Sequence, residues 1–450
     1  MAMGADHTTR DPRRRLVVAG NGMVGHHFLD AAVERGLHRS HEIVVLGEES
    51  HPAYDRVHLT TALEGADHDA LRLGDPDFHE SHGVRLLTGR RAERIDVDGR
   101  TVTTCSGDVI AYDHLVLATG SAPFVPPIPG TDLAGVFVYR TLDDVEAIRS
   151  WARQCERGVV IGGGLLGLEA AGALRALGVH TTVVELAERL MAVQLDAQGG
   201  RALRRHIEAM GIDVLTGVAA SEVVATHDGR VAGVAFGDPD DGAAAPVPAD
   251  AVVFAAGIRP RDELARAAGL ALGERGGVAV DDTLLTSDPH ISAIGEVAAH
   301  RGGRSYGLVS PGYQQAEVVA ERLAGGTATF AGADTSTKLK LLGVDVASIG
   351  DAFAHAEAAE EVVYSDPVAG VYKKLVLSGD GTRILGAVLV GDASAYGSVL
   401  QYVRNDIAAP EHPERLILPA GDGAPVGLTP GDLPDGATVC SCHNVTKGAI

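Results

Sequence analysis

The sequence predicts an α/β protein with two doubly wound parallel sheets, followed by a smaller α+β domain. Two glycine-rich turns with the same spacing occur, and each stands between a short apolar run and a helical pattern. Each half also closes with an apolar run that ends in glycine: Gly20 to Gly120 spans 100 residues, and Gly162 to Gly257 spans 95. Alternating strand and helix patterns are typical of parallel, doubly wound sheets.

Each half contains, in order, a strand, a glycine-rich turn, a helix, a second strand and a closing strand. In the first half these are expected at residues 16–19, 20–25, 26–35, 43–46 and 115–119. In the second half they are expected at residues 158–161, 162–167, 168–177, 181–184 and 252–256. Such a repeat predicts two copies of one structural unit.

The two turns have the spacing Gly-x-Gly-x-x-Gly, which predicts dinucleotide binding. The first glycine permits the tight turn, the second lets the backbone approach a pyrophosphate, and the third lets the helix pack on the strand. The N–H groups at the start of the helix then face the phosphates. The glycines concerned are Gly20, Gly22 and Gly25 in the first turn, and Gly162, Gly164 and Gly167 in the second.

An acidic residue is expected at the end of the second strand of each copy, where it binds a ribose hydroxyl. Glu48 and Glu185 stand there. Leu186 and Ala187 follow Glu185, with no adjacent arginine to accept a 2′-phosphate, so NADH is favoured over NADPH. The alternative for Glu185 is a solvated acid at a strand end. Glu169, two residues past Gly167, either faces the nicotinamide or simply favours the helix N-terminus.

The pattern changes after Pro311. A helix is expected at 312–323, and apolar runs at 339–350 and 371–390 predict strands of an α+β domain over residues 331–415. Residues 416–437 form a linker, because nine of the eighteen residues from Pro419 to Gly436 are glycine or proline. Cys440 and Cys442 follow it.

Composition excludes several classes of protein. Sixty acidic against 38 basic residues give a formal charge of −22, which disfavours nucleic acid and anionic membranes as partners. Four cysteines are too few for a secreted disulfide scaffold. We find neither a signal-peptide pattern nor an apolar stretch long enough to span a bilayer, so the cytoplasm is the expected location.

The ordered motifs resemble the FAD/NAD oxidoreductases with two dinucleotide sites, such as glutathione reductase, rubredoxin reductase and ferredoxin reductases. Besides the turns, the motifs are Ala118-Thr119-Gly120, Ala255-Ala256-Gly257 and Ile294-Gly295-Glu296. The resemblance implies a glutathione-reductase-type FAD domain at 14–120 and 251–330, and an NAD domain at 121–250. It implies that Thr119, Gly120, Gly295 and Glu296 bind FAD, with the last two on the ribityl chain, and that Gly257 binds NAD.

A narrower resemblance is to the large subunit of assimilatory NAD(P)H nitrite reductase. It rests on residues 20–26, 53–59, 164–172, 338–346 and 439–442. It implies that Tyr54 and Arg56 lie near the flavin ring and that Arg140 approaches the flavin pyrophosphate.

That family continues into an iron–sulfur domain and a sirohaem portion, whereas this sequence stops eight residues after Cys442. A [2Fe–2S] cluster normally needs four thiolates. We therefore expect residues 438–450 to be the start of a truncated [2Fe–2S] domain, with Cys440 and Cys442 as half of a site that is empty in this chain. The alternative is two unligated thiols. The [2Fe–2S], [4Fe–4S] and sirohaem groups are expected only in a full-length parent protein.

The resemblance implies an enzyme that moves electrons from NADH through FAD to an iron–sulfur and sirohaem acceptor, in cis or on a subunit, for the reduction of nitrite to ammonia. No cysteine lies between His26 and Arg100, which disfavours thiol chemistry at the flavin. One alternative is a separate reductase subunit for nitrate reductase or a rubredoxin-like carrier. Another is a nucleotide-sensing module without turnover. The acceptor and the oligomeric state stay open, with a homodimer as one expectation.

Overall fold

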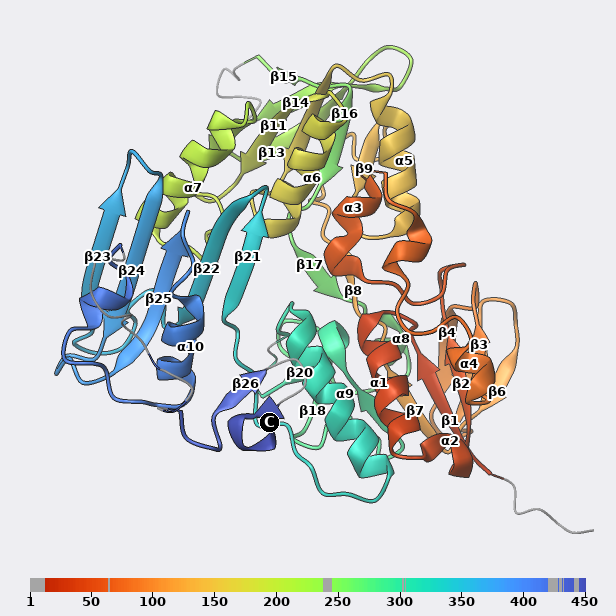
Figure 1. The fold of residues 1–450 in the computed structure, drawn as a ribbon. Helices are drawn as coiled ribbons and strands as arrows, with labels where there is room; N and C mark the ends of the chain where they lie inside the picture. The colour runs from red at the N-terminus through yellow and green to blue at the C-terminus, as the bar shows by residue number, and fades with distance from the viewer. Residues whose placement is uncertain are drawn as a thin grey trace, which may run out of the picture. The chain divides into compact units, whose positions relative to one another are not determined.

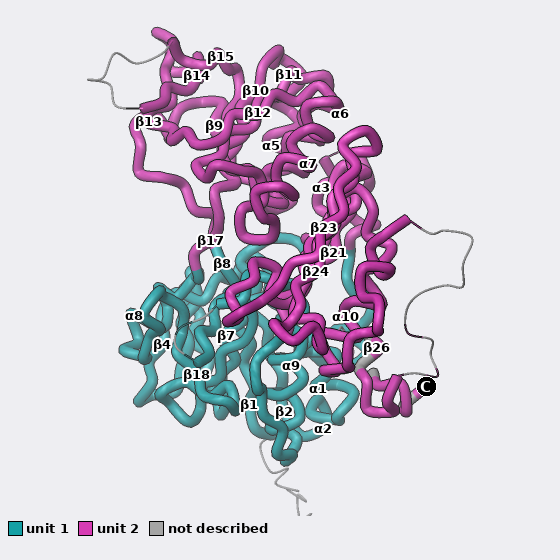
Figure 2. The backbone as a smooth tube through the Cα atoms, turned by 90° about the vertical axis from the view of Figure 1, so that its left-hand side faces the viewer, with its two compact units in different colours: residues 1–55, 72–121, 260–333 teal, residues 56–71, 122–259, 334–450 magenta. Residues whose placement is uncertain are grey.

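A computed structural model describes residues 13–63, 65–237, 245–301, 303, 305–419, 428, 431, 433–440 and 445–450. The chain divides into two compact units, drawn in teal and magenta in Figure 2. The first unit comprises residues 1–55, 72–121 and 260–333, and the second comprises residues 56–71, 122–259 and 334–450.

The first unit is built on a five-stranded parallel sheet. Its strands are β1 (Arg14–Ala19), β2 (His41–Leu46), β3 (Arg85–Leu87), β7 (His114–Leu117) and β19 (Ile291–Ala293), in the order β19-β7-β1-β2-β3. Helices α1 (Met23–Glu34) and α9 (Val309–Leu323) lie side by side (Figure 1) and pack on one face of it. Pro311 lies in the first turn of α9, where its missing N–H leaves no helical hydrogen bond unmade.

The second unit repeats this sheet. Its strands are β9 (Val136–Val138), β10 (Arg157–Ile161), β11 (His180–Glu185), β12 (Asp213–Thr216) and β16 (Ala251–Phe254), all parallel, in the order β12-β11-β10-β16-β9. Helices α5 (Leu142–Ala152), α6 (Leu165–Ala176) and α7 (Ala197–Ala209) accompany it. Helices α1 and α6 are each 12 residues long, and each is followed closely by a glycine with positive φ, Gly36 at 75° and Gly178 at 87°.

Both sheets carry a three-stranded antiparallel insertion at the same edge, after β3 and before β7 in the first unit and after β12 and before β16 in the second. In the first unit it consists of β4 (Ala92–Asp96), β5 (Thr101–Thr104) and β6 (Val109–Ala111). In the second it consists of β13 (Ala220–Ala225), β14 (Val231–Phe236) and β15 (Val247–Pro248). The duplication expected from the glycine-rich turns therefore extends to four strands and the insertion. The fifth strand differs, because β19 follows β7 in the chain whereas β9 precedes β10.

The C-terminal domain, in the second unit, is an antiparallel sheet with a helix on it (Figure 1, teal to blue). Its strands are β21 (Thr337–Leu341), β22 (Val344–Gly350), β23 (Glu360–Asp366), β24 (Val371–Leu377) and β25 (Ile384–Val390), in the order β21-β22-β25-β24-β23. Helix α10 (Tyr396–Arg404) packs on β22 and β25, while α7 contacts β24 and β25. The predicted fold class is thus confirmed.

The remaining elements are short. They are α2 (Leu37–Ser40), α3 (Leu59–Leu63), α4 (Phe78–Ser81), α8 (Glu263–Ala267), β8 (Ser121–Pro123), β17 (Ile258–Pro260), β18 (Val278–Val280), β20 (Ala298–His300), β26 (Thr438–Cys440) and β27 (Val445–Thr446), with 3₁₀ turns that include η1 (Arg56–His58) and η4 (Gly295–Val297). Among the described residues, no helix is both long enough and apolar enough to cross a bilayer.

The two compact units do not follow the expected domain boundaries throughout. Residues 251–259 belong to the second unit rather than the first, because β16 is hydrogen-bonded between β10 and β9. Residues 56–71 also belong there, because α3 packs on α5 and α6. At the expected start of the linker, Leu416 and Ile417 are buried in the core of the C-terminal domain. Regular packing thus continues slightly past residue 415.

Candidate functional site

The first glycine of each turn has a backbone that only glycine adopts readily. Gly20 has φ 123° and Gly162 has φ 119°. A Cβ on Gly20 would overlap the carbonyl oxygen of Ala118, and one on Gly162 would overlap that of Ala255. The alanines belong to the two motifs that close the halves. The turn therefore comes so close to the backbone after the closing strand that its first residue has no room for a side chain in either copy.

The other two glycines of each turn have opposite surroundings. A Cβ on Gly25 would overlap the carbonyl oxygen of Gly20, and one on Gly167 would overlap that of Gly162. The third glycine thus lets the helix approach its own turn. By contrast, a Cβ on Gly22 or Gly164 would meet no atom within 4 Å. The side of the turn that should face a pyrophosphate is open in both copies.

The helix N-termini behind the open glycines are also suited to an anion. Gly22 and Gly164 are the N-caps of α1 and α6, and neither helix has a side-chain cap or an acidic residue in its first turn. Their first N–H groups therefore have no side-chain acceptor, and they favour a negative charge. In the first turn, both amide atoms of Asn21 are buried without a hydrogen-bond partner. These features fit one bound dinucleotide in each unit.

Glu185 is held against the second turn. Its Oε2 accepts the backbone N–H of Gly163 at 2.6 Å, and its Oε1 accepts that of Ala187 at 2.7 Å. A carboxylate has about four acceptor positions, so two stay available for ribose hydroxyls. Glu48 has a different environment, because it forms an ion pair with Arg261 and lies 3.9 Å from Nε of Arg91.

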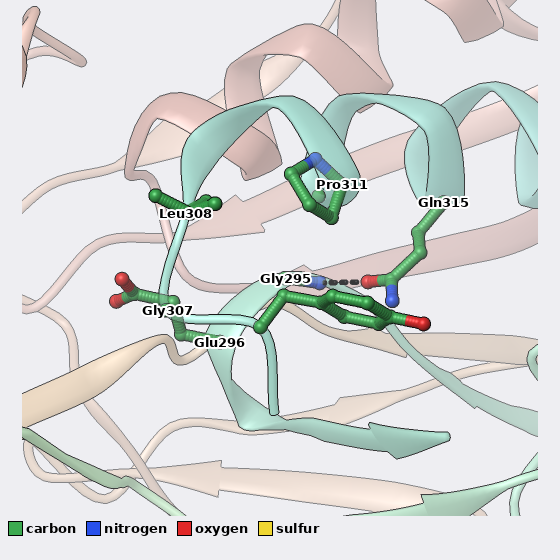
Figure 3. A pocket seen from close by; sticks show the side chains of 8 residues that line it. Gly295, Glu296, Gly307, Leu308, Pro311 and Gln315 are labelled. Atoms are coloured by element: carbon green, nitrogen blue, oxygen red, sulfur yellow. Dashed lines mark hydrogen bonds between the residues drawn. The ribbon is translucent and has the colours of Figure 1, made fainter. Parts of the chain in front are cut away.

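The Gly295–Glu296 turn packs between α1 and α9. The N–H of Gly295, which has φ 78°, donates to Oε1 of Gln315 at 2.7 Å, and Figure 3 shows Gln315 reaching this backbone from α9. Gly312 on α9 lies so close that its Cβ would approach Val24 of α1 to 2.6 Å. A small pocket beside the turn is lined by Gly295, Glu296, Tyr306, Gly307, Leu308, Pro311, Gly312 and Gln315.

The motif that closes the first sheet connects to this turn. Oγ of Ser121 donates to the Glu296 carboxylate at 2.6 Å. Thr119 Oγ1 donates to the carbonyl of Arg261 at 2.9 Å, and Gly120, with φ 69°, accepts the N–H of Arg261. Ser121 and Arg261 were missed by the sequence argument. The only signal for Ser121 was its place directly after Ala118-Thr119-Gly120, and Arg261 is remote from Glu48 in sequence.

The residues expected near the flavin ring are divided between the units. Tyr54, in the first unit, donates its hydroxyl to Glu49 at 2.7 Å. Arg56, in the second, donates from Nη1 to the carbonyl of Arg140 at 3.0 Å, so these two predicted residues do lie together. The N–H of Arg140 in turn donates to Asp144 at 3.0 Å. Gly257 has φ 112° and accepts the N–H of Phe124.

Glu169 is half-buried on α6. Burial raises the pKa of its carboxyl to about 7, although a hydrogen bond from Thr60 and the nearby charge of His58 act in the opposite direction. An acid whose pKa is raised toward neutrality beside a glycine-rich turn is a candidate functional group.

Only one of the two cysteines of the predicted iron–sulfur half-site lies among the described residues. Cys440 ends β26, and Cys442 lies outside the described residues. Within the described part of the chain, no group of three or more His, Cys, Asp or Glu residues could hold a metal ion. Cys105 is a free, exposed thiol, and burial raises the pKa of the Cys155 thiol to about 11. A thiol with a raised pKa is a poor nucleophile, so Cys155 is not activated in this structure.

Two copies of one nucleotide-binding unit, each with an open turn and an uncapped helix, define an oxidoreductase of the class that holds two dinucleotides. The chain belongs to the pyridine nucleotide-disulphide oxidoreductase family, which matches residues 14–318. Residues 336–407 match the C-terminal domain of rubredoxin NAD+ reductase. The C-terminal sheet and α10 lie within that range.

Similar proteins support the assignment to this family. The chain is 51% identical to the nitrite reductase [NAD(P)H] large subunit of Klebsiella oxytoca, over 97% of this chain and 45% of that protein. It is 36% identical to the assimilatory nitrate reductase electron transfer subunit of Bacillus subtilis, over 97% of this chain and 55% of that protein. The chain thus spans about half the length of these relatives. A ferredoxin reductase structure from Rhodopseudomonas palustris has a TM-score of 0.78 at 29% identity, covering 90% of this chain and 97% of that one.

Proposed function

We propose that this chain binds FAD at the first glycine-rich turn and NADH at the second, and passes electrons from NADH through FAD to an acceptor. The observation that carries the proposal is the pair of open, uncapped turns at Gly22 and Gly164. Bound FAD supplies the chemistry that takes up a hydride and releases single electrons. The protein contributes binding, orientation and electrostatics, without a thiol relay.

The test is an anaerobic titration of the FAD-loaded protein with NADH, followed at the flavin absorbance band. We expect stoichiometric bleaching of the flavin. A protein that takes up no FAD and does not respond to NADH would refute the proposal. If NADH binds but the flavin stays oxidised, the chain is a nucleotide-sensing module.

The relatives that are named nitrite reductases support a proposal for the acceptor. We propose that the chain is the reductase portion that supplies an iron–sulfur and sirohaem centre, in cis or on another subunit, for nitrite reduction to ammonia. Cys440 and Cys442 would then supply two of the four thiolates of a [2Fe–2S] cluster. A cytoplasmic location is part of this proposal and is checked by cell fractionation.

This second proposal has its own test. The 450-residue chain should reduce artificial acceptors with NADH but should not turn over nitrite. Nitrite turnover by this chain alone would contradict it.

A second candidate function is favoured by the relative named as a nitrate reductase electron transfer subunit. In that case the chain is a separate subunit that docks on a nitrate reductase or a rubredoxin-like carrier. Tight, salt-sensitive binding to such a partner would distinguish this function from the first.

A further inference from the structure

Glu169 lies at the start of the helix that follows the second glycine-rich turn. It is two residues past Gly167, within the first two turns of α6. Under the proposed function, the N-terminus of α6 faces the NADH pyrophosphate. When it is ionised, this half-buried carboxyl places a negative charge beside the proposed NADH site.

Two hydroxyl groups from other elements hold this carboxyl. Thr60, on α3, makes a side-chain hydrogen bond to Glu169. Tyr139, directly after β9 and fully buried, donates its hydroxyl to Oγ1 of Thr60 at 3.0 Å. A threonine hydroxyl has a single hydrogen. Because Thr60 accepts from Tyr139, that hydrogen is directed to Glu169, and the chain of donors runs from Tyr139 through Thr60 to the carboxylate.

The direction of these bonds favours the ionised carboxyl, whereas its burial favours the neutral one. Burial is the larger effect on the pKa of Glu169, and the Thr60 hydrogen bond and the charge of His58 oppose it. The elements packed on α6 include α3, β10, β11, β16 and β21. The charge that acts on Glu169 is that of His58, which ends η1 directly before α3. Loss of the Thr60 donor would therefore favour the neutral form.

We propose that Thr60 and Tyr139 are positioning residues that hold the Glu169 carboxyl as a pH-sensitive contact for the nicotinamide half of NADH. This inference rests on the proposed NADH site. The nicotinamide ring becomes positively charged when it gives up its hydride. An ionised Glu169 stabilises that charge, so the protein should favour NAD+ and oxidise NADH faster as Glu169 ionises.

The first experiment measures NAD+ and NADH binding by calorimetry across the neutral pH range. We expect the ratio of NAD+ to NADH affinity to rise through a midpoint near the pKa of Glu169, and Glu169→Gln to abolish this midpoint. Thr60→Val should move the midpoint upward by about one pH unit, because it removes a donor to the ionised form. Thr60→Ser should retain the wild-type midpoint, and Tyr139→Phe should shift it upward by less.

The neighbouring residue provides a matched control. Thr61 is exposed and donates its Oγ1 hydrogen to the carbonyl of His58 at 2.8 Å, so Thr61→Val should leave the midpoint unchanged. The rate of anaerobic flavin bleaching by NADH, measured on the same variants, should change with pH through the same midpoints.

The outcomes separate the two proposals. If NADH bleaches the flavin but Glu169→Gln and Thr60→Val keep the wild-type pH profile, the positioning role is wrong and the proposed function stands. If no variant responds to NADH at any pH, the proposed function itself fails. Thr60→Ser controls for misfolding, because serine keeps the hydroxyl. If Thr60→Ser moves the pH midpoint as far as Thr60→Val does, the proposed role of the hydroxyl is contradicted.

Discussion

Glu185 accepts the backbone N–H of Gly163 at 2.6 Å, and the two residues are packed so that only one of them can carry a side chain. A Cβ on Gly163 would lie 2.9 Å from Cβ of Glu185. The first unit has the reverse arrangement. There the turn residue is Asn21 and the strand-end residue is Gly47, whose Cβ would lie 3.2 Å from that of Asn21.

Sheet register confirms that these pairs are equivalent. Ala19, before the first turn, pairs with Leu46, and Ile161, before the second, pairs with Val184. Gly47 is therefore the counterpart of Glu185, and Glu48 stands one residue further on. The polar group beside the turn comes from the strand in the second copy and from the turn in the first.

Within one turn, the open glycine and the closely packed glycine should respond differently to substitution by alanine. Gly22→Ala should leave the stability of the apoprotein unchanged, because its Cβ meets open space and its φ of −90° suits any residue. It should nevertheless weaken FAD binding, because that space is where we place the pyrophosphate. Gly25→Ala should cost about 1–3 kcal/mol of stability, because its Cβ overlaps Gly20. Denaturant unfolding and flavin fluorescence titration measure the two effects. Equal losses of stability would contradict this assignment of roles.

Removal of the Glu185 carboxylate should weaken NADH binding about 10- to 100-fold, because hydrogen bonds to a charged group are worth roughly 1.5–3 kcal/mol. It should also reduce the preference for NADH over NADPH, since the 2′-phosphate would no longer meet a like charge. Glu185→Ala is compared with Glu188→Ala, an exposed acid three residues later. Calorimetry with NADH and with NADPH measures both effects on each variant. If both variants bind NADH like the wild type, Glu185 is only a strand-end acid.

The features that could be predicted from sequence are those whose causes are local. The backbone of a tight turn requires glycine at Gly20 and Gly162, and the strand and helix around each turn follow within a few residues. The order of strands then follows from the duplication. The α+β domain was predictable because its strands are long and apolar.

The features that could not be predicted depend on contacts between distant segments. Spacing alone selected Glu48 as the acid equivalent to Glu185, but cross-strand register assigns that place to Gly47. Ser121 and Arg261 act through partners more than 100 residues away, at Glu296 and Glu48. The place of residues 56–71 in the second unit likewise depends on how α3 packs, which no local pattern encodes.

Buried histidines should make the protein unstable in acid. Burial, with a smaller effect from the charge of His27, lowers the pKa of His26 to about 4, and burial also lowers that of His114 to about 4. The unfolded chain, with a histidine pKa near 6.5, then binds more protons than the native state between about pH 6.5 and 4. Stability should therefore fall as pH falls through this window. Each fully shifted histidine contributes on the order of 3 kcal/mol.

Melting curves recorded across this pH window test the effect. His26→Leu should flatten the acid limb of the stability profile, whereas His227→Leu, at a side chain that is 98% exposed, should not. An acid limb that is the same in both variants would show that other groups are responsible.

The charge cluster around Lys374 joins the C-terminal sheet to the N-terminus of α7. Lys374 is 2% exposed, and its Nζ lies 2.9 Å from Asp196, the N-cap of α7, and 2.8 Å from Glu361. Tyr372 also donates its hydroxyl to Asp196, at 2.7 Å. Breaking a buried ion pair leaves an uncompensated charge, so Lys374→Met should cost about 3–5 kcal/mol. The exposed Lys340→Met serves as the control, and denaturant unfolding measures both.

A second substitution tests whether the uncompensated charge is the cause of that loss. Glu361→Gln in the Lys374→Met background removes one of the two carboxylates that face the missing ammonium. It should restore part of the stability, because replacement of a whole buried ion pair costs less than removal of one partner. If Lys374→Met unfolds at the same denaturant concentration as Lys340→Met, the cluster contributes nothing to the packing of the C-terminal sheet on α7. If the double variant is as unstable as Lys374→Met, the loss comes from the packing of the lysine chain and not from charge.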